Sequence, residues 1–149
     1  MGASILTPTA PVARRGFLLE IPKMKYLVQY LAVAGAGALG AMARFLVASL
    51  CGSYFKTDFP VGTLIINLTG SFFLGWFLTA ASGRLTISPT LRLAIGTGFV
   101  GAYTTFSTYM FESASLLKNG ETEKAVANLL GSMILGMLAV WAGMRLAAK

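Results

Sequence analysis

The amino-acid sequence predicts an all-α membrane protein with four transmembrane helices, of which the third is broken near the middle of the membrane. Of its 149 residues, 56% are hydrophobic and only 11% are charged, which is typical of integral membrane proteins. Four apolar segments reach the length of about 20 residues that crosses a bilayer. In the third of them, glycines and a run of hydroxyl side chains interrupt the apolar pattern. The expected spans are residues 26–50, 61–81, 91–117 and 125–146.

Residues 1–24 differ from the rest of the chain, and we expect them to form a flexible N-terminal extension before a four-helix transmembrane domain at residues 25–149. This segment contains three prolines and two arginines, and its apolar run is too short for the core of a signal peptide. Met24, followed by Lys25 and an apolar span, would also make a natural N-terminus. Two interpretations are therefore open: residues 1–23 are translated as an extension, or translation starts at Met24 and the sequence begins upstream of that start.

Missing residue types exclude several classes of enzyme. The sequence has no histidine and a single cysteine, Cys51. This excludes Cys/His zinc sites, haem ligation by histidine, a Ser-His-Asp triad and any intrachain disulfide, and we expect no enzymatic activity. The net charge of +7 lies mostly in basic residues that flank the apolar spans. It indicates contact with the anionic headgroups of a lipid bilayer and not with nucleic acid.

The first span has a face of small residues, which lets helices approach closely in lipid. Arg44 lies inside this span near one end. One interpretation is that its guanidinium extends to the membrane interface. The other is that it bonds to acceptors on a neighbouring helix and fixes the packing, so that its role is structural in either case. The small residues of this face are Gly35, Gly37, Gly40 and Ala41.

The second span begins after Pro60, which suits the first turn of a helix. Thr63, Asn67 and Ser71 follow at spacings of four residues, so their side chains lie on one helix face. A carboxamide near the middle of a bilayer is unfavourable unless it has a partner. Asn67 therefore either forms a hydrogen bond between helices or lines a pore.

The third span is expected to break at its centre. Gly96, Gly98 and Gly101 weaken the helix, since each glycine is about 1 kcal/mol less favourable there than alanine. Irregular backbone at membrane depth is tolerated only where protein buries it or where it borders a water-filled cavity. The break is thus a candidate site for a small polar solute or ion. Just after the glycines come four hydroxyl side chains within five positions, Thr104, Thr105, Ser107 and Thr108.

The fourth span repeats a short pattern of the second. Both read N-L-x-G-S-x-x-L-G, from Asn67 in the second span and from Asn128 in the fourth. The pattern is consistent with two helices that present similar polar tracks to a common centre.

The distribution of basic residues predicts the orientation in the membrane. Four spans put both termini on one side, and eight basic residues lie on that side against three on the other. The positive-inside rule then places both termini in the cytoplasm. A start at Met24 would leave five against three, a bias small enough to allow both orientations.

The polar residues of the spans favour an anion as the solute. Within the spans the only carboxylate is Glu112, toward the end of the third, whereas cation pathways and proton-coupled transporters use intramembrane carboxylates. An anion needs hydrogen-bond donors instead. The candidates are the Asn67 amide, backbone N–H groups at a helix start, and the hydroxyls of Thr63, Ser71, Thr104, Thr105, Ser107, Thr108 and Ser132.

Two aromatic rings and a set of backbone carbonyls near the break are further candidates for contact with an ion. Phe106 and Tyr109 are three residues apart and share a face if the helix resumes there. Their ring edges carry partial positive charge that suits a small anion, although two aromatics can also simply pack in a core. The carbonyls exposed at Gly101–Thr104 can hold a small cation such as Na⁺.

Three motifs resemble those of the Fluc/CrcB family of fluoride channels. The segment G-F-V-G-A-Y-T-T-F-S-T-Y at residues 98–109 is similar to that family's G-F-x-G-x-x-T-T-F-S-T-F signature. Residues 62–72 and 40–45 resemble its second-helix and first-helix motifs, and the Asn-Leu-Leu-Gly-Ser run of the fourth span also fits. The resemblance covers about residues 26–147.

The resemblance implies an antiparallel, dual-topology homodimer in the plasma (cell inner) membrane, with two pores that export F⁻ passively. In it, Phe106 would offer a ring edge to the ion, and Asn67 would donate a hydrogen bond. Backbone carbonyls of Gly101 and Thr104 from both subunits would bind a structural Na⁺ on the dimer axis. Thr63 would line the path, Ser132 would supply the polar track of the fourth helix, and the remaining expected path residues are Tyr109, Ser107 and Thr108. Arg44 and Glu112 are assigned structural roles.

The sequence departs from the family pattern in two places. Tyr109 stands where the family usually has a second phenylalanine, and its hydroxyl could donate to fluoride, bond elsewhere or narrow the pore. The fourth helix offers fewer hydroxyls than the pattern, with Asn128, Gly136 and Val140 along its track. The charge bias of the longer N-terminus favours one orientation, which a heterodimer with an oppositely oriented paralogue would accommodate.

Two other functions remain as alternatives. A small dual-topology multidrug or cation transporter would need a carboxylate in the first span, and no acidic residue lies between Lys25 and Lys56. A non-transporting membrane assembly subunit would use its small-residue faces for helix contacts alone.

Overall fold

The computed structural model describes residues 24–83 and 85–149 and contains no strand within these ranges. The expected N-terminal extension therefore lies outside the described residues except for Met24, which begins the first helix. The elements are α1 (Met24–Tyr54), α2 (Val61–Gly83), α3 (Pro89–Leu93), the π-helix η1 (Ala94–Val100), α4 (Gly101–Tyr103), α5 (Phe106–Lys118) and α6 (Thr122–Ala147).

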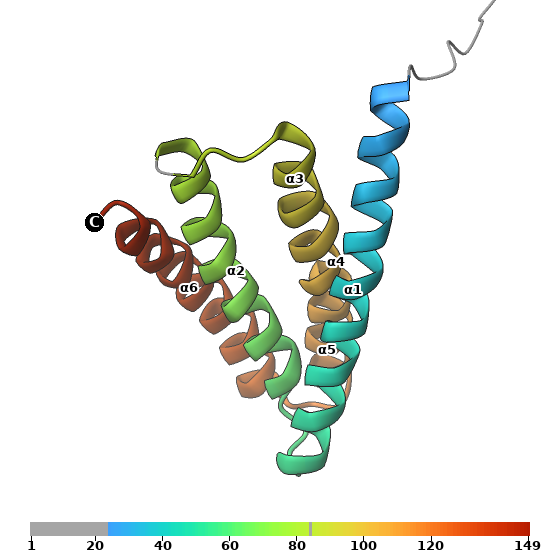
Figure 1. The fold of residues 1–149 in the computed structure, drawn as a ribbon. Helices are drawn as coiled ribbons and strands as arrows, with labels where there is room; N and C mark the ends of the chain where they lie inside the picture. The colour runs from blue at the N-terminus through green and yellow to red at the C-terminus, as the bar shows by residue number, and fades with distance from the viewer. Residues whose placement is uncertain (1–23, 84) are drawn as a thin grey trace, which may run out of the picture.

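Of the described helices, three are long and apolar enough to cross a membrane: Tyr26–Tyr54 of α1, α2 and α6. The expected third span is instead a column of shorter helices, α3, η1, α4 and α5, that runs alongside α1 (Figure 1). The break expected in this span is confirmed, because α4 ends at Tyr103 and α5 begins at Phe106. The chain is thus a multi-pass membrane protein with one interrupted segment.

The helices form two arms that meet at one end and diverge at the other (Figure 1). One arm is α2 packed along α6, and the other is α1 packed chiefly against η1. The arms meet near the short connection between α1 and α2. At this end Lys124 of α6 lies 3.6 Å from Asp58 in that connection and also pairs with Glu121. The broken segment belongs to the arm that contains α1 (Figure 1).

Glycines allow the closest helix contacts in both arms. A Cβ at Gly143 would overlap the Phe72 carbonyl oxygen, and a Cβ at Gly75 would overlap that of Val140, so α2 and α6 touch through their backbones. In the other arm, Gly40 lies against the Phe99 carbonyl. The small-residue contact expected of the first span is confirmed at Gly40, whereas no neighbouring atom of the described residues lies within 4 Å of a Cβ at Gly35.

We predict that Gly143→Ala destabilises the protein by about 1–3 kcal/mol, the usual effect of overpacking. Gly131→Ala in the same helix is the control, because a Cβ there would meet nothing within 4 Å. Thermal unfolding in detergent should show a lower midpoint for Gly143→Ala alone. Equal midpoints for the two variants would contradict the close approach of α2 and α6.

Candidate functional site

The break in the third segment is a short stretch of extended backbone at Thr104 and Thr105. Thr104 has ψ 159°, and Thr105 has φ −148° and ψ 120°. Thr105 then caps α5, since its hydroxyl oxygen accepts from the Thr108 N–H at 3.3 Å. The same hydroxyl donates to Thr108 Oγ1 at 3.0 Å. Thr104 and Thr105 therefore form the break, and Thr108 takes part in the N-terminal cap of α5.

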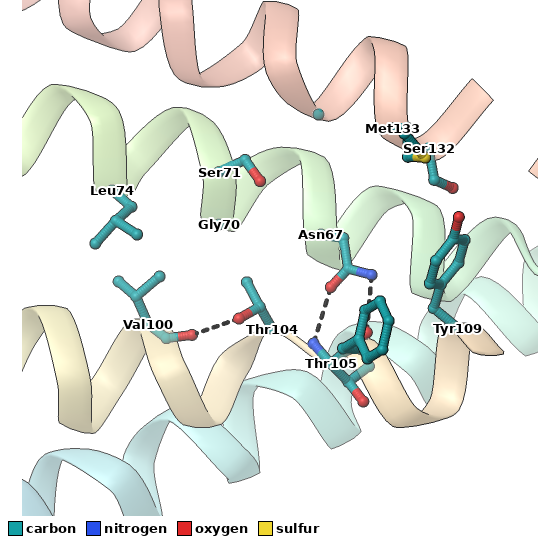
Figure 2. A pocket seen from close by; sticks show the side chains of 12 residues that line it. Asn67, Gly70, Ser71, Leu74, Val100, Thr104, Thr105, Tyr109, Ser132 and Met133 are labelled. Atoms are coloured by element: carbon teal, nitrogen blue, oxygen red, sulfur yellow. Dashed lines mark hydrogen bonds between the residues drawn. The ribbon is translucent and has the colours of Figure 1, made fainter. Parts of the chain in front are cut away.

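Asn67 forms hydrogen bonds to both polar groups of the Thr105 backbone at the break. Its Nδ2 donates to the Thr105 carbonyl at 3.0 Å, and its Oδ1 accepts from the Thr105 N–H at 2.8 Å (Figure 2). A carboxamide carries two N–H groups, so one of them is not used by this pair. Asn67 thus forms the expected hydrogen bonds between helices through its oxygen and one N–H, and its second N–H has no partner in this pair.

A groove of about 310 Å³ lies beside this break. It is bordered by α2, α6 and the broken segment (Figure 2). Phe106 also lines it, although its ring is 75% exposed in the single chain. The ring centroids of Phe106 and Tyr109 are 6.0 Å apart with an angle of 54° between the planes. The polar side chains along the groove are Asn67, Ser71, Thr104, Thr105, Tyr109 and Ser132.

Besides Thr105, three other groove hydroxyls donate their hydrogens to the protein itself. Thr104 bonds to the Val100 carbonyl at 3.0 Å, and Ser132 bonds more weakly to Asn128 Oδ1 at 3.3 Å. The Tyr109 hydroxyl donates to the Leu129 carbonyl at 2.8 Å, and the residue is only 7% exposed. Among the three possibilities for this hydroxyl, the structure therefore favours a bond elsewhere, which ties α5 to α6.

A buried polar pair between Asn128, which the repeated pattern had marked, and Ser113, which the sequence analysis did not name, reinforces this contact. Asn128 Nδ2 donates to the Ser113 hydroxyl at 2.9 Å, and Ser113 donates to the Tyr109 carbonyl at 2.8 Å. Each of the two side chains is 1% exposed. The repeated N-L-x-G-S pattern was the available signal, since it places Asn128 where Asn67 stands in the second span.

Residues 31–144 match the family described as CrcB-like protein, Camphor Resistance (CrcB). The chain belongs to the CrcB family. It is 47% identical over 117 residues, 78% of this chain and 94% of the relative, to the fluoride-specific ion channel FluC of Acidobacterium capsulatum. It is 45% identical over 112 residues, 75% of this chain and 90% of the relative, to the protein of the same name from Aquifex aeolicus. A relative named fluoride-specific ion channel FluC 2, from Moorella thermoacetica, is 45% identical over 114 residues, 76% of this chain and 92% of the relative.

Other residues expected along the path of this CrcB protein lie outside the groove. Thr63 is buried and donates to Glu112 Oε1 at 2.9 Å, while Glu112 Oε2 is buried without a hydrogen-bond partner in the described part of the chain. These two side chains line a smaller hollow of about 190 Å³. Ser107 and Thr108 are exposed on the first turn of α5. Arg44 is half-buried and makes no hydrogen bond or ion pair within residues 24–83 and 85–149.

The backbone at the break has the chemistry that a small, hard cation requires. In a continuous helix the Thr105 N–H would bond to the Gly101 carbonyl, but here it bonds to Asn67. The Gly101 carbonyl is thereby released from helix bonding, and the Thr104 carbonyl belongs to extended backbone. Carbonyl oxygens are suitable ligands for hard cations, so the expected pair fits Na⁺. In the described ranges, no group of three or more His, Cys, Asp or Glu side chains offers a competing metal site.

We predict that Tyr109→Phe lowers the free energy of unfolding by about 0.5–1.5 kcal/mol, because it removes one hydrogen bond and keeps the ring. Thermal unfolding of the purified protein in detergent measures the change. Tyr54→Phe serves as the control, since Tyr54 is 81% exposed at the end of α1. Unchanged stability of Tyr109→Phe would mean that its bond to α6 does not form.

Proposed function

We propose that this CrcB protein is a fluoride-selective channel, without enzymatic activity, that gives passive export of F⁻ from the cytoplasm and protects the cell from fluoride. The proposal rests mainly on the groove in which the Asn67 carboxamide meets the Phe106 and Tyr109 rings beside a broken helix. It is supported by relatives up to 47% identical that are named fluoride-specific ion channels. The plasma (cell inner) membrane is its proposed location.

The chemistry of the groove suits transient binding of a small anion. An ion enters a pore only if its hydration shell is replaced, and it leaves only if no single site holds it tightly. None of the described residues that line the groove is charged. The unused Asn67 N–H and the Phe106 ring edge would offer weak, neutral stabilisation to F⁻. Thr63, Ser107, Thr108 and Ser132 would extend the path beyond the groove or along its wall.

We further propose that two copies assemble as an antiparallel, dual-topology homodimer. In the most apolar window of α1, only 6% of residues are buried within the chain, which leaves a long surface for a partner. The Gly101 and Thr104 carbonyls of both copies would then hold Na⁺ at the dimer axis. The alternative is a heterodimer with a paralogue, and the numbered name of the relative FluC 2 is consistent with paralogues in that organism.

The proposed channel predicts F⁻ efflux from proteoliposomes, measured with a fluoride electrode while valinomycin balances the charge with K⁺. Wild-type vesicles should release F⁻ and retain Cl⁻. Vesicles that hold fluoride would refute the channel, and flux driven by a cation gradient would favour a cation or multidrug transporter.

Phe106→Ile should reduce this efflux by about tenfold or more, a loss of about 1.4 kcal/mol or more in stabilisation of the ion. Phe111→Ile is the matched control, since Phe111 lies on the same helix and is 73% exposed but does not line the groove. Size-exclusion chromatography should show unchanged assembly of both variants. Loss of assembly in Phe106→Ile would instead support a non-transporting subunit.

A further inference from the structure

Ser71 differs from the other polar residues of the groove. Within the described residues, it is the one groove side chain whose polar atom has no hydrogen-bond partner. Serine and threonine in helices often donate to the carbonyl one turn earlier, as Thr69 does to Ile65 at 2.7 Å. Ser71 makes no such bond. A hydroxyl hydrogen that the chain does not use can be donated to a solute, so the Ser71 hydroxyl is available to an acceptor in the groove.

The residue of α6 that faces Ser71 is a glycine and has no side chain. A Cβ built at Gly136 of α6 would lie 4.0 Å from Ser71 Oγ, and among the described residues no other atom outside its own stretch of helix lies within that distance. Asn128, Ser132 and Gly136 are spaced four residues apart on α6, so they occupy successive turns of one face. The polar side chains of this face therefore end where Ser71 reaches across from α2.

Ser71 also lies one turn beyond Asn67, and both project from successive turns of α2 (Figure 2). Side chains four residues apart on a helix have Cβ atoms about 5–6 Å apart. This separation is short enough for a small anion to pass directly from the unused Asn67 N–H to the Ser71 hydroxyl. The next groove residue along the same helix is Leu74, which has no polar atom.

We infer that Ser71 is a fluoride-contacting residue, which donates its hydroxyl hydrogen to the ion after Asn67 and replaces the hydroxyl that α6 lacks at Gly136. This inference rests on the proposed channel function. It places both donors to the ion, the Asn67 N–H and the Ser71 hydroxyl, on α2, whereas the Ser132 hydroxyl of α6 donates to Asn128.

The test moves the hydroxyl from one wall of the groove to the other. Ser71→Ala should reduce F⁻ efflux from proteoliposomes by about tenfold, equivalent to about 1.4 kcal/mol, and Ser71→Thr should retain most of it. The double variant Ser71→Ala/Gly136→Ser should recover efflux, because a side chain at Gly136 enters free space next to residue 71. Ser115→Ala is the control, since the Ser115 hydroxyl donates to the Phe111 carbonyl at 2.9 Å outside the groove.

The outcomes separate this inference from the channel function. Wild-type efflux in Ser71→Ala, or no recovery in the double variant while its assembly is intact, would overturn the assignment of Ser71 alone. Absence of F⁻ efflux from wild-type vesicles would refute the channel and the assignment together. A purely structural role of Ser71 predicts lower thermal stability of Ser71→Ala and no recovery of flux by a hydroxyl on the opposite helix.

Discussion

The two hydrogen bonds between the Asn67 carboxamide and the Thr105 backbone are the interaction on which the functional part of the structure depends. A helix break in a membrane leaves N–H and C=O groups that have no water to bond with. Asn67 accepts from the Thr105 N–H, which has lost its helical partner, at 2.8 Å and also donates to the Thr105 carbonyl at 3.0 Å. Because both atoms belong to one side chain on α2, the break is held at a fixed position relative to that helix. The groove lies directly beside this junction.

The same junction determines which groups remain for a solute. Most polar side chains of the groove are saturated by the protein, as the bonds of Thr104 and Tyr109 show. A hydroxyl that already donates its hydrogen presents only an acceptor to an anion. The effective donors are therefore few and neutral: the spare Asn67 N–H and the Ser71 hydroxyl. A small number of weak donors is compatible with rapid passage, since an ion that is held tightly does not leave.

Rigid packing around the groove has a different origin on each wall. Glycines at 75 and 143 let the backbones of α2 and α6 touch, so this wall is fixed by close contact over its length. The wall between α5 and α6 is fixed by the buried Asn128–Ser113 pair and by the Tyr109 hydroxyl. Hydrogen bonds in an apolar environment are costly to leave unmade. The hydrogen bonds on one wall and the close backbone contacts on the other therefore both resist a change in groove width.

The sequence by itself determined the features that depend on local pattern: apolar segments of membrane length, the weakness of the glycine-rich third segment, and the shared face of Thr63, Asn67 and Ser71. It also gave the family, because the residue order around Thr104–Thr108 is specific. Only the tertiary structure decided how each polar atom is used. It paired Thr63 with Glu112 and not with the groove, turned the Tyr109 hydroxyl to α6, and left Ser71 facing Gly136. Periodicity places a side chain on a helix face, but its hydrogen-bond partner depends on the neighbouring helix, which lies far away in the sequence.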